Sequence, residues 1–300
     1  MTLTLRPTLG LALGALTLTG LPLAAIAGPD YLSYSSSFTA FGDGDGAIYL
    51  PELDVAADYS FGNVVLSGAL SAAKAYTDDS SDGELNIYGG DITAGYRVLP
   101  DFTLSAGYGA TKIEGALFET YTLGSEYHSG SFSAGVSYAS DGDDTSNTAI
   151  FAGYDAGGLY ATAGAFLYED STDVILALGN DTGSYASDAA LLFNSDEDTT
   201  LAALDVKYNI GRNFRALGEV FYADLGESDL TVASIGGGYQ FQNGTWMDLT
   251  GGKVWAEGDD VAHVITLELS VETGRRALQG QKFRDDYSEA LPAFLDVFVD

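Results

Sequence analysis

Short segments that alternate with period two run from Tyr31 to Thr273, and they are joined in turn by brief polar turns and by acidic loops. One face of each segment is mostly apolar and the other is small or polar, which is typical of strands between two different environments. In the core of a bilayer every backbone N–H and C=O must be paired within the protein, so only helices and closed barrels can span it. No apolar helix of spanning length follows the first 27 residues. The pattern therefore predicts an all-β fold, a closed antiparallel transmembrane β-barrel.

We expect sixteen strands, and most of them approach the roughly 9 to 11 residues that a tilted strand needs to cross a membrane. Residues 174–178 are continuously apolar instead of alternating, which leaves a second count open. In that alternative, residues 169–198 form one long loop of a fourteen-stranded barrel. The sixteen expected strands are residues 31–41, 47–59, 64–76, 85–98, 102–112, 117–128, 131–139, 147–155, 159–168, 173–178, 184–194, 199–210, 214–225, 230–241, 245–256 and 262–273.

The connections between these strands fall into two classes. One class is short and contains Gly and Asn, as tight hairpins do. The other class is acidic and holds 21 Asp and Glu residues, whereas the short class holds only two, Asp101 and Asp181. Two sides of a membrane would produce this difference.

Aromatic residues flank the short connections, as they do where an outer-membrane barrel meets the membrane interface. Cross-strand pairs in a soluble hairpin explain each aromatic pair singly, but not their recurrence on one side. The pattern therefore favours an interfacial girdle. Its members are Tyr59, Phe61, Tyr96, Phe102, Tyr127, Phe132, Tyr154, Tyr160, Tyr208, Phe214, Phe241 and Trp246.

Residues 1–27 have the composition of a secretory signal peptide. Arg6 precedes an apolar stretch, residues 11–23, and Ala25-Ile26-Ala27 forms a small-x-small cleavage site. The stretch is shorter than the ~20 residues of a membrane-spanning helix. We therefore expect residues 28–273 to form an exported barrel. Residues 274–300 differ in composition and form a C-terminal tail, for which a periplasmic, a lumenal and an unstructured state all remain open.

The charge of the chain excludes some partners. Without Arg6, eleven basic residues stand against 43 acidic ones, which argues against binding of nucleic acid. High net charge can indicate disorder. A hydrophobic share of 46% and a mean hydropathy of +0.08 indicate instead a folded chain whose charge is segregated from its apolar surface. No cysteine is present, so the sheet has to hold together without disulfides.

The polar phase of the expected strands faces the lumen and carries twelve charged residues, nine acidic and three basic. Carboxylates in a narrow aqueous passage favour cations. The same residues would also solvate and brace a barrel wall, and both interpretations remain open. The predicted pore-lining residues are Glu52, Asp54, Asp58, Asp91, Arg97, Asp205, Lys207, Arg215, Glu219, Asp248, Glu268 and Glu272.

Three lysines, Lys74, Lys112 and Lys253, fall on the apolar phase near the acidic-loop ends of their strands. A lysine at that depth can extend to the interface, so we predict that they contact lipopolysaccharide phosphates; chance placement is the alternative.

Residues 43–46 do not match an EF-hand loop, because Gly stands at the fourth instead of the sixth position. Weak bridging of Ca²⁺ or Mg²⁺ to lipopolysaccharide, or plain solvation, is the expected role of the acidic loops. No dedicated metal site and no cofactor are predicted.

Enzymatic activity is not predicted. Only two histidines are present, and His263 lies on the apolar phase. A serine nucleophile needs a base within hydrogen-bond reach, oriented by a third group. We expect His128 and Ser129 in a turn, without the spacing of an acid partner.

The segment Tyr59-Ser60-Phe61-Gly62-Asn63-Val64 and the Gly-Tyr pairs at 95–96, 107–108, 153–154 and 238–239 resemble the turns and strands of α-proteobacterial porins. The resemblance is architectural and covers about residues 31–273. It implies a Gram-negative outer-membrane barrel for passive diffusion of small hydrophilic solutes, often a homotrimer. Two features depart from the family: only residues 114–116 separate the fifth and sixth strands, where porins place a long constriction loop, and 27 residues follow Thr273.

The sequence thus predicts a porin-like diffusion channel that leans towards cations and contacts outer-membrane lipids and lipopolysaccharide. A non-conducting structural or adhesive outer-membrane barrel is the first alternative. A secreted, soluble all-β binding protein is the second.

Overall fold

The computed structural model describes residues 29–42, 47–77, 85–113, 116–141, 146–156, 158–169, 174–177, 190–193, 199–224, 229–256, 259–274 and 276–278. None of these segments contains a helix that is long and apolar enough to cross a membrane. They form β1 (Tyr31–Gly42), β2 (Ala47–Phe61), β3 (Val64–Thr77), β4 (Leu85–Leu99), β5 (Phe102–Ile113), β6 (Ala116–Ser129), β7 (Phe132–Ser140), β8 (Ser146–Ala156), β9 (Leu159–Glu169), β10 (Val174–Ala177), β11 (Ala190–Phe193), β12 (Thr199–Ile210), β13 (Phe214–Asp224), β14 (Asp229–Gln240), β15 (Trp246–Ala256) and β16 (Asp259–Gly274). The predicted signal peptide lies outside the described residues.

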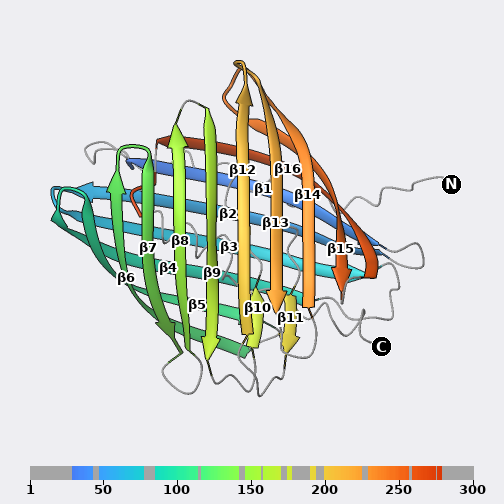
Figure 1. The fold of residues 1–300 in the computed structure, drawn as a ribbon, viewed down its shortest axis with the longest axis horizontal. Coiled ribbons are helices and arrows are strands. Elements are labelled where there is room, and N and C mark those ends of the chain that lie inside the picture. The colour runs from blue at the N-terminus through green and yellow to red at the C-terminus, as the bar shows by residue number, and fades with distance from the viewer. Residues whose placement is uncertain are drawn as a thin grey trace, which may run out of the picture.

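Fourteen of the strands form one closed antiparallel barrel, in which near and far strands cross steeply when seen from the side (Figure 1). Neighbours follow chain order except where β12 pairs with β9. The barrel closes between its first and last strands, which pair from Tyr31↔Gly274 to Gly42↔His263. Closure removes the edges of the sheet, so backbone groups along the wall pair with the next strand.

The strands β10 and β11 are not part of the barrel wall. They pair only with each other, from Val174↔Phe193 to Ala177↔Ala190, and each has four residues. That is less than half of the roughly 9 to 11 residues of a membrane-crossing strand. The preferred count of sixteen barrel strands is therefore wrong, and the alternative of fourteen, with residues 169–198 as one long connection, is confirmed.

The two ends of the barrel differ in their connections, and we call them the turn side and the loop side. On the turn side, short connections join β2 to β3, β4 to β5, β6 to β7, β8 to β9, β12 to β13 and β14 to β15. Five of them contain a glycine with positive φ, a conformation that side chains disfavour; these are Gly62, Gly130, Gly158, Gly211 and Gly244. Most residues of the acidic loop-side connections lie outside the described part of the chain.

The two faces of the wall follow the predicted phases. On β12, Leu201, Ala203, Asp205 and Lys207 are buried, whereas Leu204, Tyr208 and Ile210 are exposed. The buried phase faces the inside of the barrel, and the exposed phase carries large apolar side chains on its outside. This is the arrangement of a transmembrane barrel, with alternate residues facing lipid and lumen.

Outward aromatic residues gather at both ends of the wall. On the turn side, the rings of Tyr59 and Phe61 stack at 6.4 Å, and those of Phe214 and Tyr239 lie 5.2 Å apart. On the loop side, Tyr49 contacts Phe38 and Tyr76, with ring centroids 5.9 and 5.4 Å away.

Two members of the predicted girdle, Tyr160 and Trp246, are misassigned. They lie on the inward phase, where their rings cover Lys207 and Arg215. Their proximity to a turn correctly predicted that they lie near the turn-side end of the barrel. The phase of the strand decides whether they face inward or outward.

Candidate functional site

The inward wall carries the twelve charged residues that the sequence predicted, all on the inward phase. Seven are buried, four are partly buried, and Glu272 is exposed at the turn-side end of β16. The buried residues are Asp58, Asp205, Lys207, Arg215, Glu219, Asp248 and Glu268. The partly buried residues are Glu52, Asp54, Asp91 and Arg97.

A bidentate ion pair joins β13 to β15 across the inner wall. The guanidinium of Arg215 binds both carboxylate oxygens of Asp248, with Nε donating to Oδ1 at 2.9 Å, and lies 4.1 Å from the ring centroid of Trp246. Gly238 on the intervening strand stands in register with both residues. A Cβ at Gly238 would collide with the Asp248 carboxylate, so this glycine leaves the space in which the pair forms.

Carboxylates also occupy neighbouring positions on adjacent strands. Asp205 pairs in register with Glu219, and Asp248 pairs with Glu268. Directly opposed residues have Cβ atoms about 4.5–5.5 Å apart, so each pair brings two negative charges close together. The ammonium of Lys207, 3.9 Å from Asp205 Oδ2 and 5.5 Å from the Tyr160 ring, offsets part of this charge.

On β1 and β2, serine hydroxyls bind the inward acids. Ser35 donates to Asp54 at 3.1 Å and Ser37 donates to Glu52 at 3.4 Å. Arg97, near the turn-side end of β4, donates to the Ser60 hydroxyl at 3.3 Å. These contacts brace the wall, which is the structural role that the sequence left open beside selectivity.

Some inward polar residues were not singled out from the sequence. His128 lies within β6 and not in a turn as predicted, and its Nε2 is 3.1 Å from Glu126 Oε1. Both residues have the inward phase of β6 and lie within the expected strand 117–128, so following the strand phase to its end would have found the pair. Arg276, beyond the last strand, is also buried in the lumen beside Asp58.

On ten of the fourteen barrel strands the inward face of the loop side is mostly apolar, in contrast to that of the turn side. Sixteen buried hydrophobic residues form a continuous belt through β8, β9, β12 to β16 and β1 to β3, which we call the apolar belt. All of them lie towards the loop-side ends of their strands except Phe151, which lies at the middle of β8. The belt comprises Phe41, Ile48, Leu50, Ala75, Ala149, Phe151, Phe166, Leu201, Ala203, Phe221, Ala223, Leu230, Val232, Val254, Ala262 and Val264.

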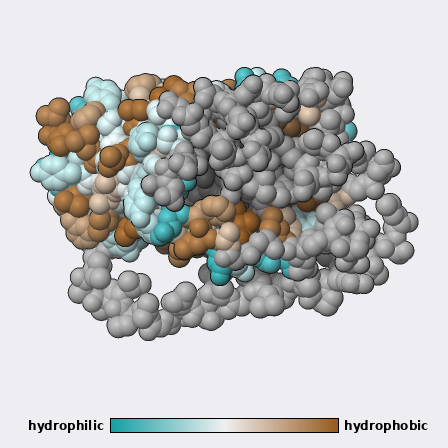
Figure 2. Space-filling view, turned by 90° about the horizontal axis from the view of Figure 1, so that it is seen from below, coloured by the Kyte–Doolittle hydropathy of each residue, from teal (hydrophilic) through white to brown (hydrophobic). Residues whose placement is uncertain are grey.

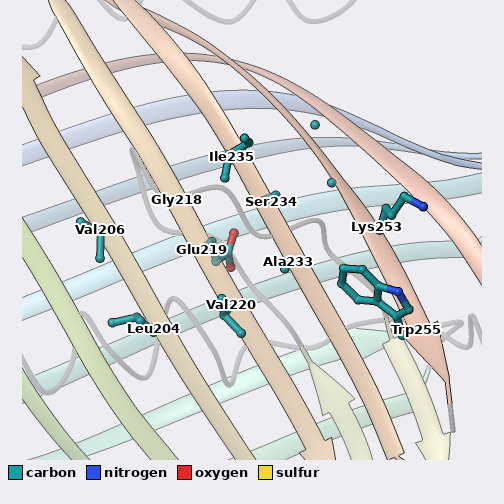
Figure 3. A pocket seen from close by; sticks show the side chains of 12 residues that line it. Leu204, Val206, Gly218, Glu219, Val220, Ala233, Ser234, Ile235, Lys253 and Trp255 are labelled. Carbon is teal, nitrogen blue, oxygen red and sulfur yellow. The ribbon is translucent and has the colours of Figure 1, made fainter. Parts of the chain in front are cut away.

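The three lysines predicted to contact lipopolysaccharide lie on the outward phase. Lys112 is exposed, and Lys74 and Lys253 are partly buried. Lys253 and Trp255 lie at one end of an outward groove of about 500 Å³ that crosses β12 to β15 (Figure 3). Its other outward lining is apolar, with Leu204, Val220 and Ile235 among the residues labelled in Figure 3.

The described residues include no group of three or more His, Asp or Glu side chains that could hold a metal ion. The loop at residues 43–46, weighed above as a calcium site, lies outside them. The ion pairs and hydrogen bonds described above give the inward wall an electrostatic chemistry, with carboxylates in excess and with paired cations and hydroxyls.

Comparison with known proteins relates the chain to other barrels by fold. No family model matches the sequence, and neither does any curated protein. The solved structure of Salmonella typhi OmpF in complex with daunomycin shares 9% identity at a TM-score of 0.50, over 81% of this chain and 96% of that chain. The monoaromatic hydrocarbon channel CymD shares 13% identity at 0.51, over 84% and 90%.

A deletion mutant of TodX, another monoaromatic hydrocarbon channel, shares 10% identity at a TM-score of 0.51, over 82% of this chain and 89% of that chain. Identities this low indicate a shared fold and nothing finer. The chain thus has the closed, porin-like β-barrel fold that its alternating segments predict.

Proposed function

We propose that this protein is a non-enzymatic channel of the Gram-negative outer membrane, through which small hydrophilic solutes diffuse passively, with a preference for cations. The observation that carries the proposal is a closed barrel whose outward phase is apolar and whose inward phase carries twelve charged side chains. The proposal extends to export through a cleaved signal peptide.

The outward surface supports a membrane location. Ile235, Leu70 and Leu123 expose 76%, 66% and 64% of their surface, and large apolar side chains on the other barrel strands are exposed beside them. Apolar residues, coloured brown, are prominent on the part of this surface that Figure 2 colours. A soluble protein rarely exposes so large a continuous apolar area. This argues against the secreted, soluble binding protein.

The connections support an orientation. Outer-membrane barrels have short periplasmic turns and longer extracellular loops. The turn side would accordingly face the periplasm, and the acidic loop side would face the outside of the cell. A homotrimer, as in many porins, is part of this proposal.

The charge of the inward wall supports cation preference. The predicted lining residues comprise nine acids against three basic side chains, and all are inward in the barrel. An excess of carboxylates in a narrow passage lowers the energy of cations there and raises that of anions.

A bilayer recording tests this function. Purified protein in a planar bilayer should give stepwise currents, and a KCl gradient should give a reversal potential of the sign for K⁺ selectivity. Replacing Glu219 and Glu268 by Gln should move this potential towards zero, because two inward charges are lost. Absence of any current from correctly inserted barrels would contradict the channel.

One observation favours a second candidate, a non-conducting structural barrel. Fourteen strands enclose a narrower lumen than the roughly sixteen to eighteen strands of porins, and the apolar belt opposes passage of hydrated ions. Liposomes that swell in sugar solutions only when they contain the protein would exclude this candidate.

Lipid contact belongs to the same proposal. The positive charge of Lys253, at the end of an apolar groove, suits a lipid that has an anionic phosphate and acyl chains. We expect Lys74, Lys112 and Lys253 to bind lipopolysaccharide phosphates, with weak Ca²⁺ or Mg²⁺ bridging at the acidic loops. Replacing all three by Gln should lower the amount of lipopolysaccharide that co-purifies; unchanged binding would exclude this role.

A further inference from the structure

The chain turns back into the barrel directly after its last strand. Gly274, which ends β16, has φ +81°, a conformation that residues with a side chain rarely adopt. A Cβ at this position would also collide with the carbonyl oxygen of Asp30. Gly274 therefore lets the chain leave the wall sharply, and the described residues that follow, Arg276 to Leu278, lie at the turn side of the lumen.

Arg276 is held there by three strands. Its Nε lies 3.7 Å from Asp58 Oδ1, and one of its terminal nitrogens donates to the Ser67 hydroxyl at 3.4 Å. The guanidinium carbon lies 5.9 Å from the ring centroid of Tyr31. Arg276 exposes only 3% of its surface, and Asp58 and Tyr31 expose none.

The three partners form a row across the inner wall. Tyr31 pairs in register with Asp58, and Asp58 pairs with Ser67. Ser67 in turn donates to Asp58 Oδ1 at 2.7 Å, which orients the carboxylate. A carboxylate, a hydroxyl acceptor and an aromatic ring are the groups that bind a guanidinium by charge, hydrogen bond and cation–π contact.

The residues after Arg276 reinforce this contact. The backbone N–H of Ala277 donates to Asp58 Oδ2 at 2.6 Å. Leu278, 1% exposed, packs against β4, where a Cβ on Gly95 would come within 3.0 Å of its Cδ2. The segment thus occupies space beside β1 to β4 that solute would otherwise share.

We propose that Tyr31, Asp58 and Ser67 form a guanidinium-binding site at the turn-side mouth of the lumen, which Arg276 of the same chain occupies. Because Arg276 fills this site, residues 276–278 narrow the mouth. The site takes small guanidinium cations when Arg276 is absent. The effect on transport rests on the proposed channel function, whereas occupancy of the site does not.

The first experiment is a chemical rescue of the full-length protein in planar bilayers. Arg276→Ala should raise the single-channel conductance, because residues 276–278 lose the contact that keeps them in the mouth. Millimolar guanidinium chloride should lower the conductance of this variant again, and should act weakly on the wild type and on Arg276→Ala with Asp58→Asn. Arg212→Ala, which removes an exposed arginine of the turn side, is the matched control.

A second experiment reads the position of the segment without any current. The chain has no cysteine, so Leu278→Cys gives a single thiol at a buried position. A membrane-impermeant maleimide should label it slowly, and about tenfold faster when Arg276→Ala is added, the factor that corresponds to about 1.4 kcal/mol of lost contact. Asp101→Cys, at an exposed turn, serves as the rapidly labelled reference.

The two readouts separate the failures. Equal labelling of Leu278→Cys with and without Arg276→Ala, or labelling as fast as that of Asp101→Cys, would overturn the site. Faster labelling with no current from any variant would retain the site and contradict the channel. Unchanged conductance of Arg276→Ala in a conducting protein would overturn the narrowing of the mouth.

Discussion

The inner wall of this barrel has two halves that share one strand phase and differ in chemistry. Along β13, the inward residues Arg215 and Glu219 are followed on the same phase by Phe221 and Ala223. Apart from apolar residues such as Leu217, the turn-side half is thus rich in charged and hydrogen-bonded side chains, and the loop-side half of the strands in the apolar belt is mostly apolar. Alternation therefore determines which side chains face inward, and the height in the wall determines whether those side chains are polar.

The difference has an energetic consequence. A buried side chain in the apolar belt stabilises the fold by leaving water, at roughly 25 cal/mol per Å². A buried charge on the turn side is costly unless a partner compensates it. The loop-side half should tolerate lost volume poorly and new charge not at all, whereas the turn-side half should depend on intact pairs.

The largest expected effect is that of a charge placed in the apolar belt. Leu201→Asp should lower the free energy of unfolding by several kcal/mol, on the order of 4, because the carboxylate would be buried without a partner. Ser133→Asp, also buried but on the turn side and opposite His128, should cost less than Leu201→Asp because the imidazole offers the new carboxylate a partner. Urea unfolding in micelles measures both, and equal costs would contradict a two-part wall.

Removing one partner of a turn-side pair should cost nearly as much. Asp248→Ala leaves the Arg215 guanidinium buried and should lower the free energy of unfolding by about 3–5 kcal/mol. Replacing both residues together, Arg215→Met with Asp248→Leu, should recover most of this loss because no charge remains buried. If the double variant is as unstable as Asp248→Ala, the pair is not the cause.

A smaller effect should follow from removing volume in the belt. Phe221→Ala, at a position 2% exposed, should cost about 3 kcal/mol through lost burial and a residual cavity. Phe214→Ala, on the same strand but outward and 57% exposed, should cost under about 1.5 kcal/mol because lipid or detergent fills the space. Equal losses in chemical unfolding would show that Phe221 does not pack inside the barrel.

The sequence predicted the faces of the wall well, because a period of two is a local property. All twelve charged residues assigned to the inward phase have it in the structure. The number of strands was less predictable. Residues 174–178 and the apolar stretch near residues 190–193 both have the composition of strands. Composition alone does not distinguish two short strands that pair only with each other from two strands of the barrel wall.

Other features depend on contacts that are distant in the sequence. Arg276 meets Asp58 more than two hundred residues away, and no periodicity of the tail indicates it. Tyr160 and Trp246 stand beside turns like the outward aromatics, and only their strand phase places them over inward cations. The apolar belt could have been predicted from the sequence, since Phe221 and Ala223 continue the inward phase of Glu219. The expectation of a polar lumen led instead to a search for charged residues only.

The most direct test of the two-part wall is accessibility along a single strand. Spin labels at single cysteines replacing Ala203, Leu204 and Lys207 of β12 would be exposed to oxygen and to a water-soluble nickel chelate in a bilayer. Oxygen should reach the outward label at 204, the chelate should reach the inward turn-side label at 207, and the chelate should reach the label at 203 in the belt much less than the label at 207. Equal chelate accessibility at 203 and 207 would contradict the two halves, and chelate access at 204 would contradict the membrane-spanning barrel itself.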